Sequence, residues 1–295
     1  MSRVVRFAWV TLGINVVVIL LGALVRATGS GAGCGESWPT CDGQMVPAVL
    51  EGARAIEFTH RVASGIAIVA VGVLAVWVFR VFGRGHLARK AAVLSVVAII
   101  GEALIGAWLV LAALVGSNDS VARSVSVPLH LLNTLLLLAA LTLAAFWAGG
   151  GGPLRPGTNR GFAMWSGAIV VGTVLVAATG AVTALADTLL PKDAVGFAIA
   201  DLAASEHLLT RLRTIHPVAA TALGVGVILL AGRRWSAVDG TARVARLLVV
   251  LVALQLAAGL ANVYLLAPVW MQLVHLLLAD AIWVAFVWFA AAGLQ

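Results

Sequence analysis

Four of the six histidines lie within long apolar segments, where ionisable side chains are rare and usually functional. They are His60, His130, His216 and His275. Two imidazoles from facing helices, level within a four-helix bundle, form an axial ligand pair for haem iron. The order along the chain predicts one pair from His60 and His130, and a second from His216 and His275. His86 and His207 lie in expected loops and are predicted to be solvated.

Other interpretations of the four histidines stay open at this point. Taken singly, each would equally suit a hydrogen-bonded residue near the membrane surface. Zinc or copper would compete with haem iron, although accessory Cys, Met and acidic ligands are scarce nearby. Two permanently bound haems without further chemistry would indicate a di-haem b-type membrane electron-transfer protein.

The elements that carry these histidines are expected to be membrane helices. The chain has 295 residues, of which 62% are hydrophobic and 11% charged, more apolar surface than a soluble domain of this size buries. Apolar runs long enough to cross about 30 Å of hydrocarbon recur along it. Eight such runs are predicted, at residues 7–26, 58–79, 91–115, 127–147, 162–183, 214–231, 247–267 and 271–291. The fold class is therefore an all-α integral membrane protein.

Charge is distributed unevenly between the loops. Most Lys and Arg residues precede the first run or lie in alternate loops, and this pattern predicts that both termini are cytoplasmic. The net charge of +7 thus indicates topology and contact with anionic lipid, not nucleic-acid binding. The first run is expected to be a retained helix, because LVRATGSG is a poor signal-peptide cleavage site. The expected location is a prokaryotic plasma membrane.

The sequence contains an internal duplication. THRVASGIAIVAVGVL, from Thr59, aligns with IHPVAATALGVGVILL, from Ile215, and places His60 on His216. LHLLNTLLLLAA and VHLLLADAIWVA repeat the pattern with the other two histidines. The Gly- and Pro-rich residues 149–161 read as a cytoplasmic linker between residues 1–148 and 162–295. Two four-helix bundles related by a pseudo-twofold axis along the membrane normal are therefore predicted.

The two halves differ three residues before the first histidine of each, where Glu57 corresponds to Arg213. Residues three apart share a helix face, so Glu57 is expected to face whatever His60 binds. A carboxylate there suits proton abstraction or stabilisation of positive charge, whereas arginine suits a haem propionate. Alternatively, Glu57 fixes an imidazole tautomer or pairs with Arg61. The asymmetry predicts a substrate half and a cofactor half.

Four arginines near the predicted external helix ends are candidate propionate contacts, namely Arg26, Arg61, Arg211 and Arg213. Two further acids fall inside apolar runs. Glu102 and Asp280 are expected to bond to neighbouring helices, and a proton path is the alternative. Because Asp280 follows His275 by five residues, it is expected to face away from that histidine's ligand.

The two cysteines, Cys34 and Cys41, lie in GCGESWPTC, in the first predicted external loop. An oxidising compartment favours a disulfide between them. The disulfide would be either a structural link or a redox-active pair that exchanges with a thiol partner. Two thiols without a nearby histidine pair are too few ligands for zinc.

Taken together, the motifs resemble those of the haem A synthases, the CtaA/Cox15 family. The resemblance rests on GALVRATGSGAGCGESWPTC, IEFTHR, HLLNT, RTIHPVAA and QLVHLLLAD, in this order over nearly the whole chain. It implies oxidation of one ring methyl of haem O to a formyl group by two successive hydroxylations, which gives haem A for terminal oxidases. It also implies haem O as the substrate and haem O synthase as an upstream partner.

The same resemblance implies roles for individual residues. His216 and His275 would hold haem B as the cofactor, while His60 and His130 would receive the substrate haem, with Glu57 essential beside them. The pair Cys34 and Cys41 matches one typical of many bacterial members. The chain departs from some relatives because it has no second cysteine pair between residues 183 and 214.

A transporter is an alternative function that the repeat alone supports. Such a protein would contain no stoichiometric haem.

Overall fold

The computed structural model describes residues 2–189, 208–236 and 241–295, without the side chains of residues 208–214. Within these residues all regular structure is helical, and eight helices are long and apolar enough to cross a membrane. They are α1 (Arg3–Ala27), α2 (Gly52–Val81), α3 (Leu87–Leu111), α4 (Val121–Ala148), α5 (Arg160–Leu189), α7 (Leu208–Gly232), α8 (Thr241–Tyr264) and α9 (Val269–Gly293). The predicted fold class and all eight predicted runs are confirmed.

Several helices extend beyond the apolar runs that predicted them. α2 begins at Gly52 and α4 at Val121, each about two turns before its predicted run. A polar side chain caps the extension of α4, where Ser120 Oγ accepts a hydrogen bond from the backbone N–H of Arg123. His86, expected in a loop, caps α3 by accepting from the N–H of Ala88. Because α2 begins at Gly52, Glu57 lies inside this helix, in its second turn.

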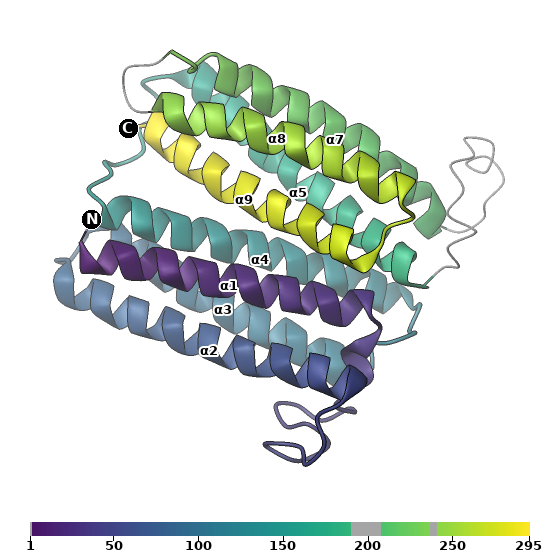
Figure 1. Ribbon diagram of the computed structural model, residues 1–295. Helices are drawn as coiled ribbons and strands as arrows, with labels where there is room; N and C mark the ends of the chain where they lie inside the picture. Colours follow the sequence, from purple (N-terminus) through teal and green to yellow (C-terminus); the bar gives the residue numbers. More distant parts are fainter. Residues whose placement is uncertain (1, 190–207, 237–240) are drawn as a thin grey trace.

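The helices form two groups, α1–α4 and α5 with α7–α9, which lie side by side (Figure 1). The groups share the same order of contacts, because α1 packs on α2 and α3 on α4 as α5 packs on α7 and α8 on α9. α4 and α9 form much of the boundary between the groups, where the indole N–H of Trp283 donates to the carbonyl of Leu135 at 2.8 Å.

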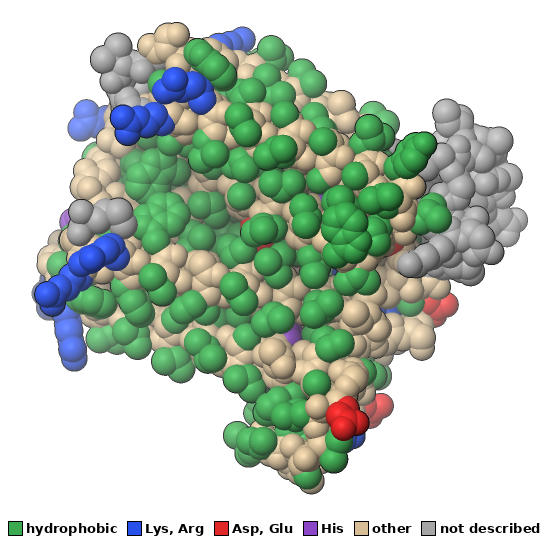
Figure 2. Space-filling model, in the orientation of Figure 1, with side chains coloured by type: hydrophobic (Ala, Val, Ile, Leu, Met, Phe, Trp, Pro, Cys, Tyr) green, Lys and Arg blue, Asp and Glu red, His purple; other side chains and the backbone are tan. Residues whose placement is uncertain are grey.

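Both chain ends lie at the same end of the bundle (Figure 1). On the face drawn in Figure 2, Lys and Arg side chains gather at this end, Asp and Glu side chains lie mainly toward the opposite end, and apolar side chains cover much of the surface between them. The distribution has the charge asymmetry from which the sequence predicts cytoplasmic termini, and that assignment stays a prediction.

Candidate functional site

A cavity of about 2040 Å³ extends between the two helix groups. All four histidines of the predicted pairs line it. Each lies six to nine residues after the first residue of its helix, which places the four toward the end of the bundle opposite the chain termini. The structure thus brings together the four histidines that sequence reasoning singled out.

The second pair faces across the cavity. The ring centres of His216 on α7 and His275 on α9 are 6.5 Å apart, with their planes at 76°. Two metal–imidazole bonds of about 2 Å, with each ring centre about 1 Å beyond its nitrogen, place axial imidazole centres roughly 6 Å apart. The observed separation therefore suits two ligands on opposite sides of one metal.

Glycines allow the histidine rings to lie against neighbouring helices. A Cβ added at Gly22 on α1 would meet Cε1 of His60 at 3.0 Å, and one added at Gly180 on α5 would meet Cε1 of His216 at 2.8 Å. Gly259 on α8 has the same relation to His275, at 3.2 Å. Because the first two contacts are equivalent in the two halves, they support the duplication inferred from the sequence.

Unpaired ring nitrogens test whether the cavity suits haem. Nδ1 of His60 and of His275 is buried without a hydrogen-bond partner in the described part of the chain, whereas Nδ1 of His130, which also has no formed hydrogen bond there, lies 2.9 Å from Glu102 Oε2. Buried polar atoms are ordinarily paired, so such atoms are free to take or support a ligand. No cluster of three or more His, Cys, Asp or Glu among the described residues could hold a metal ion. Haem iron needs only two protein ligands, and the donor set therefore fits it.

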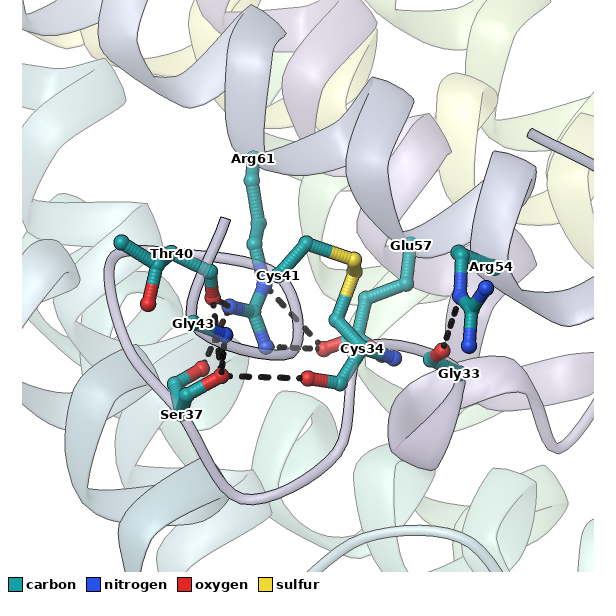
Figure 3. A network of polar contacts seen from close by, with 9 residues as sticks. All are labelled: Gly33, Cys34, Ser37, Thr40, Cys41, Gly43, Arg54, Glu57 and Arg61. Atoms are coloured by element: carbon teal, nitrogen blue, oxygen red, sulfur yellow. Dashed lines mark hydrogen bonds and ion pairs between the residues drawn. A yellow bond between two sulfur atoms is a disulfide. The ribbon is translucent and has the colours of Figure 1, made fainter. Parts of the chain in front are cut away.

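Glu57 is paired on the side facing the cysteine loop (Figure 3). Its Oε2 accepts a hydrogen bond from the N–H of Cys34 at 2.8 Å, and its Oε1 forms an ion pair with Arg61 at 2.5 Å. The Arg61 guanidinium also donates to the carbonyls of Ser37, at 2.6 Å, and Thr40. This is the pairing that the sequence left as the alternative, although both side chains also line the cavity.

Cys34 and Cys41 lie at disulfide distance, with their sulfur atoms 2.00 Å apart, and both are fully buried. The bridge closes the loop whose carbonyls hold Arg61 (Figure 3). The cysteine pair, Arg61 and Glu57 consequently form one connected network at the edge of the cavity. The sequence predicted the bridge but not its link to Glu57.

Of the four candidate propionate arginines, two have described side chains. Arg61 belongs to the network around Glu57. Arg26 on α1 reaches the other half, where it donates to the carbonyl of Ala184 at 2.5 Å and to Thr188 Oγ1 and Gln272 Oε1 at 2.8 Å each. The side chains of Arg211 and Arg213, and the whole of His207, lie outside the described residues.

The two membrane acids differ in their surroundings. Glu102 contacts α4 through Asn133, Thr134 and His130, so its expected bond to a neighbouring helix is observed. Asp280 is buried, but its Oδ2 has no hydrogen-bond partner in the described part of the chain. Asp280 also lines the cavity, contrary to the expectation that it faces away. The reason is that the cavity continues between the helix groups and so reaches more than one face of α9.

Comparisons with known proteins identify the class. Residues 5–287 match the family described as cytochrome oxidase assembly protein (COX15-CtaA), and the chain belongs to this family. It is 46% identical over 301 residues to a Thermus thermophilus protein named protoheme IX farnesyltransferase, all of the chain matching 49% of that relative. The chain thus spans about half the length of that protein.

Partial matches connect the chain to proteins named heme A synthase. One from Geobacillus kaustophilus is 41% identical over 127 residues, which cover 43% of this chain and 37% of the relative. One from Bacillus mycoides is 39% identical over 108 residues, covering 36% and 35% respectively.

Proposed function

We propose that the protein is a haem A synthase, which oxidises a ring methyl of haem O to a formyl group. The facing pair His216 and His275, at a separation that suits axial ligation, is the observation that carries this proposal. Membership of the family and the relatives named heme A synthase support it. Single-ligand pockets span about 300–1,000 Å³. A cavity of about 2040 Å³ therefore has room for two large ligands.

The two histidine pairs would have different occupants. His216 and His275 would hold haem B, which when bound supplies a one-electron redox centre. His60 and His130 would hold haem O as the substrate, beside Glu57. This division is proposed because Glu57 lines the cavity in the N-terminal half and Glu102 contacts His130, whereas the neutral Gln255 lies beside His275 in the other half.

The reaction requires water and proton acceptors at the substrate half. In the first round one water oxygen would be added while two protons and two electrons are removed, the electrons passing to an external electron acceptor, so the methyl becomes an alcohol. A second round gives a gem-diol, which loses water to leave the aldehyde. Glu57 would accept the proton of the attacking water or stabilise positive charge at the porphyrin edge. To do so, its carboxylate would loosen its contact with Arg61, which stays bound to the loop carbonyls.

The pigment of the purified protein tests the proposal. The protein is produced together with a haem O synthase, purified in detergent, and its haems are extracted and separated by mass. Haem B with haem O or haem A supports the synthase. Two haem B molecules per chain, with neither of the others, would instead support the di-haem electron-transfer protein, and a colourless protein would support a transporter.

The substrate would be delivered by a haem O synthase in the same membrane, a prokaryotic plasma membrane with the cysteine loop external. The Thermus thermophilus relative, twice as long as this chain and named protoheme IX farnesyltransferase, supports this partner. This chain matches 49% of that relative, so farnesyl transfer would belong to the part that this chain does not match. Co-purification of separately tagged proteins from one membrane checks the association; complete separation in mild detergent would count against it.

A further inference from the structure

Glu102 on α3 is held against His130 by polar neighbours. Its Oε2 is 2.9 Å from Nδ1 of His130. Its Oε1 accepts hydrogen bonds from Asn133 Nδ2 at 2.6 Å and Thr134 Oγ1 at 3.2 Å. Asn133 also donates to the carbonyl of Ala98 at 2.8 Å, which ties α4 to α3. The carboxylate is thus fixed from two sides beside the imidazole.

This contact is at ion-pair distance but is not an aligned hydrogen bond. Nδ1 of His130 has no formed hydrogen bond in the described part of the chain. Functional hydrogen bonds are often misaligned before a ligand binds and tighten afterwards. Within the described residues, His130 is the one ionisable side chain at ion-pair distance from Glu102. Among the arginines whose side chains are described, none lies at ion-pair distance from this carboxylate, in contrast to Glu57.

Gln255 takes the corresponding place in the other half. It lies nine residues before the end of α8, as Glu102 lies nine residues before the end of α3. A glycine follows each by four residues, Gly106 and Gly259. The amide nitrogen of Gln255 is 3.2 Å from Nε2 of His275. The two halves therefore place a carboxylate and a neutral amide, respectively, beside corresponding histidines.

We propose that Glu102 is a positioning residue that makes His130 a stronger iron ligand than its counterpart His275. A ligating histidine whose second N–H faces a carboxylate, as Nδ1 of His130 faces Glu102, is more basic than one whose neighbour is a neutral amide, such as the Gln255 nitrogen beside Nε2 of His275. Stronger donation favours ferric over ferrous iron and lowers the reduction potential. The porphyrin of the N-terminal half would then be easier to oxidise than that of the C-terminal half, as oxidation of the substrate requires. This inference rests on the proposed function.

Reciprocal variants of the full-length protein test the inference. The unaltered protein, Glu102→Gln and Gln255→Glu are loaded with haemin, and their reduction potentials and low-spin ferric electron paramagnetic resonance signals are measured. Glu102→Gln should shift the N-terminal porphyrin to higher potential and leave the other unchanged. Gln255→Glu should shift the C-terminal haem to lower potential and leave the first unchanged. Glu102→Asp should recover part of the lost difference.

The outcomes separate this inference from the proposed function. If Glu102→Gln leaves both potentials and both resonance signals unchanged while two porphyrins are bound, Glu102 has no such role. If the unaltered protein binds no second porphyrin under any haemin concentration, the proposed function and this inference both fail. If Glu102→Gln cannot retain the N-terminal porphyrin, Gln255→Glu decides the matter, because an unchanged C-terminal potential would then overturn the inference.

Discussion

The two halves of the molecule share a helix order and a histidine pair, but they differ at corresponding positions around that pair. The N-terminal half has Glu57 tied to Arg61 and the cysteine loop, and Glu102 beside His130. The C-terminal half has the neutral Gln255 beside His275, and an imidazole pair already separated as two axial ligands are. The proposed function would therefore assign the chemistry to the half with Glu57 and Glu102, and permanent haem ligation to the other half.

Other residues that differ between the halves lie at the boundary where the halves meet, not around the histidine pairs. Arg26, four residues after Gly22, donates to the carbonyl of Ala184, which follows Gly180 by the same four residues. Leu135 and Asp280 each follow a pair histidine by five residues. Both lie on the helices α4 and α9, which pack on each other, and Leu135 is apolar whereas Asp280 is an acid whose Oδ2 has no hydrogen-bond partner among the described residues. The duplication has therefore also diverged where the two copies meet.

Removing the acid that distinguishes the substrate half should have the largest effect. Glu57→Gln should lower conversion of haem O about 100-fold or more, because the amide cannot accept a proton. Conversion is measured by mass spectrometry of extracted haems, and the C-terminal haem absorption serves as the control for folding. Conversion at the unaltered rate would remove Glu57 from the reaction.

Removing the hydrogen bonds by which Arg26 joins the two halves should chiefly lower the stability of the protein. Arg26→Ala removes three hydrogen bonds from a charged donor and should lower the free energy of unfolding by about 2–4 kcal/mol. Arg54→Ala, which breaks the exposed ion pair with Asp42, is the control and should cost about 1 kcal/mol or less. Thermal unfolding in detergent compares them. Equal losses would mean that Arg26 does not hold the halves together.

Replacing a glycine that lies against a histidine ring should weaken haem binding only in the half that carries the substitution. Gly180→Ala places a methyl 2.8 Å from His216 Cε1 and should weaken haem B binding by about 1–3 kcal/mol. Gly22→Ala should act in the same way on the substrate pair. Gly226→Ala, on the same helix as His216 and without a neighbour within 4 Å, is the matched control. Haem titration monitored by absorption measures each, and a loss as large in the control would contradict the assigned contact.

Replacing Asp280 with the residue at the corresponding position of the other half should give the smallest change, a small increase in stability. Asp280→Leu gives the C-terminal half the residue of the N-terminal half and removes an unpaired buried acid. The free energy of unfolding should rise by about 1 kcal/mol. The reciprocal Leu135→Asp should be destabilising. A loss of stability in Asp280→Leu, measured by thermal unfolding, would show that the carboxyl group has a partner.

The sequence predicted the parts of the site that depend on local pattern. Hydropathy located all eight helices, and the repeat placed the four histidines in pairs that line one cavity. The orientation of Glu57 depends on how residues 28–51 fold back over α2, which no helical periodicity encodes. The contacts of Glu102 with His130 and of Gln255 with His275 depend on the register between adjacent helices, which the sequence pattern does not give. The prediction that Asp280 faces away from the site was wrong because the cavity extends between the two halves. The packing of one bundle on the other cannot be predicted from the sequence pattern of either bundle alone.

The proposed function requires a cofactor haem in the C-terminal half and a substrate haem in the N-terminal half. The direct test is the haem composition of His60→Ala and His216→Ala, each produced together with a haem O synthase and extracted after purification. The account predicts haem B without haem O or haem A in His60→Ala, and loss of haem B in His216→Ala. Loss of haem B from His60→Ala with its retention in His216→Ala would contradict the assignment.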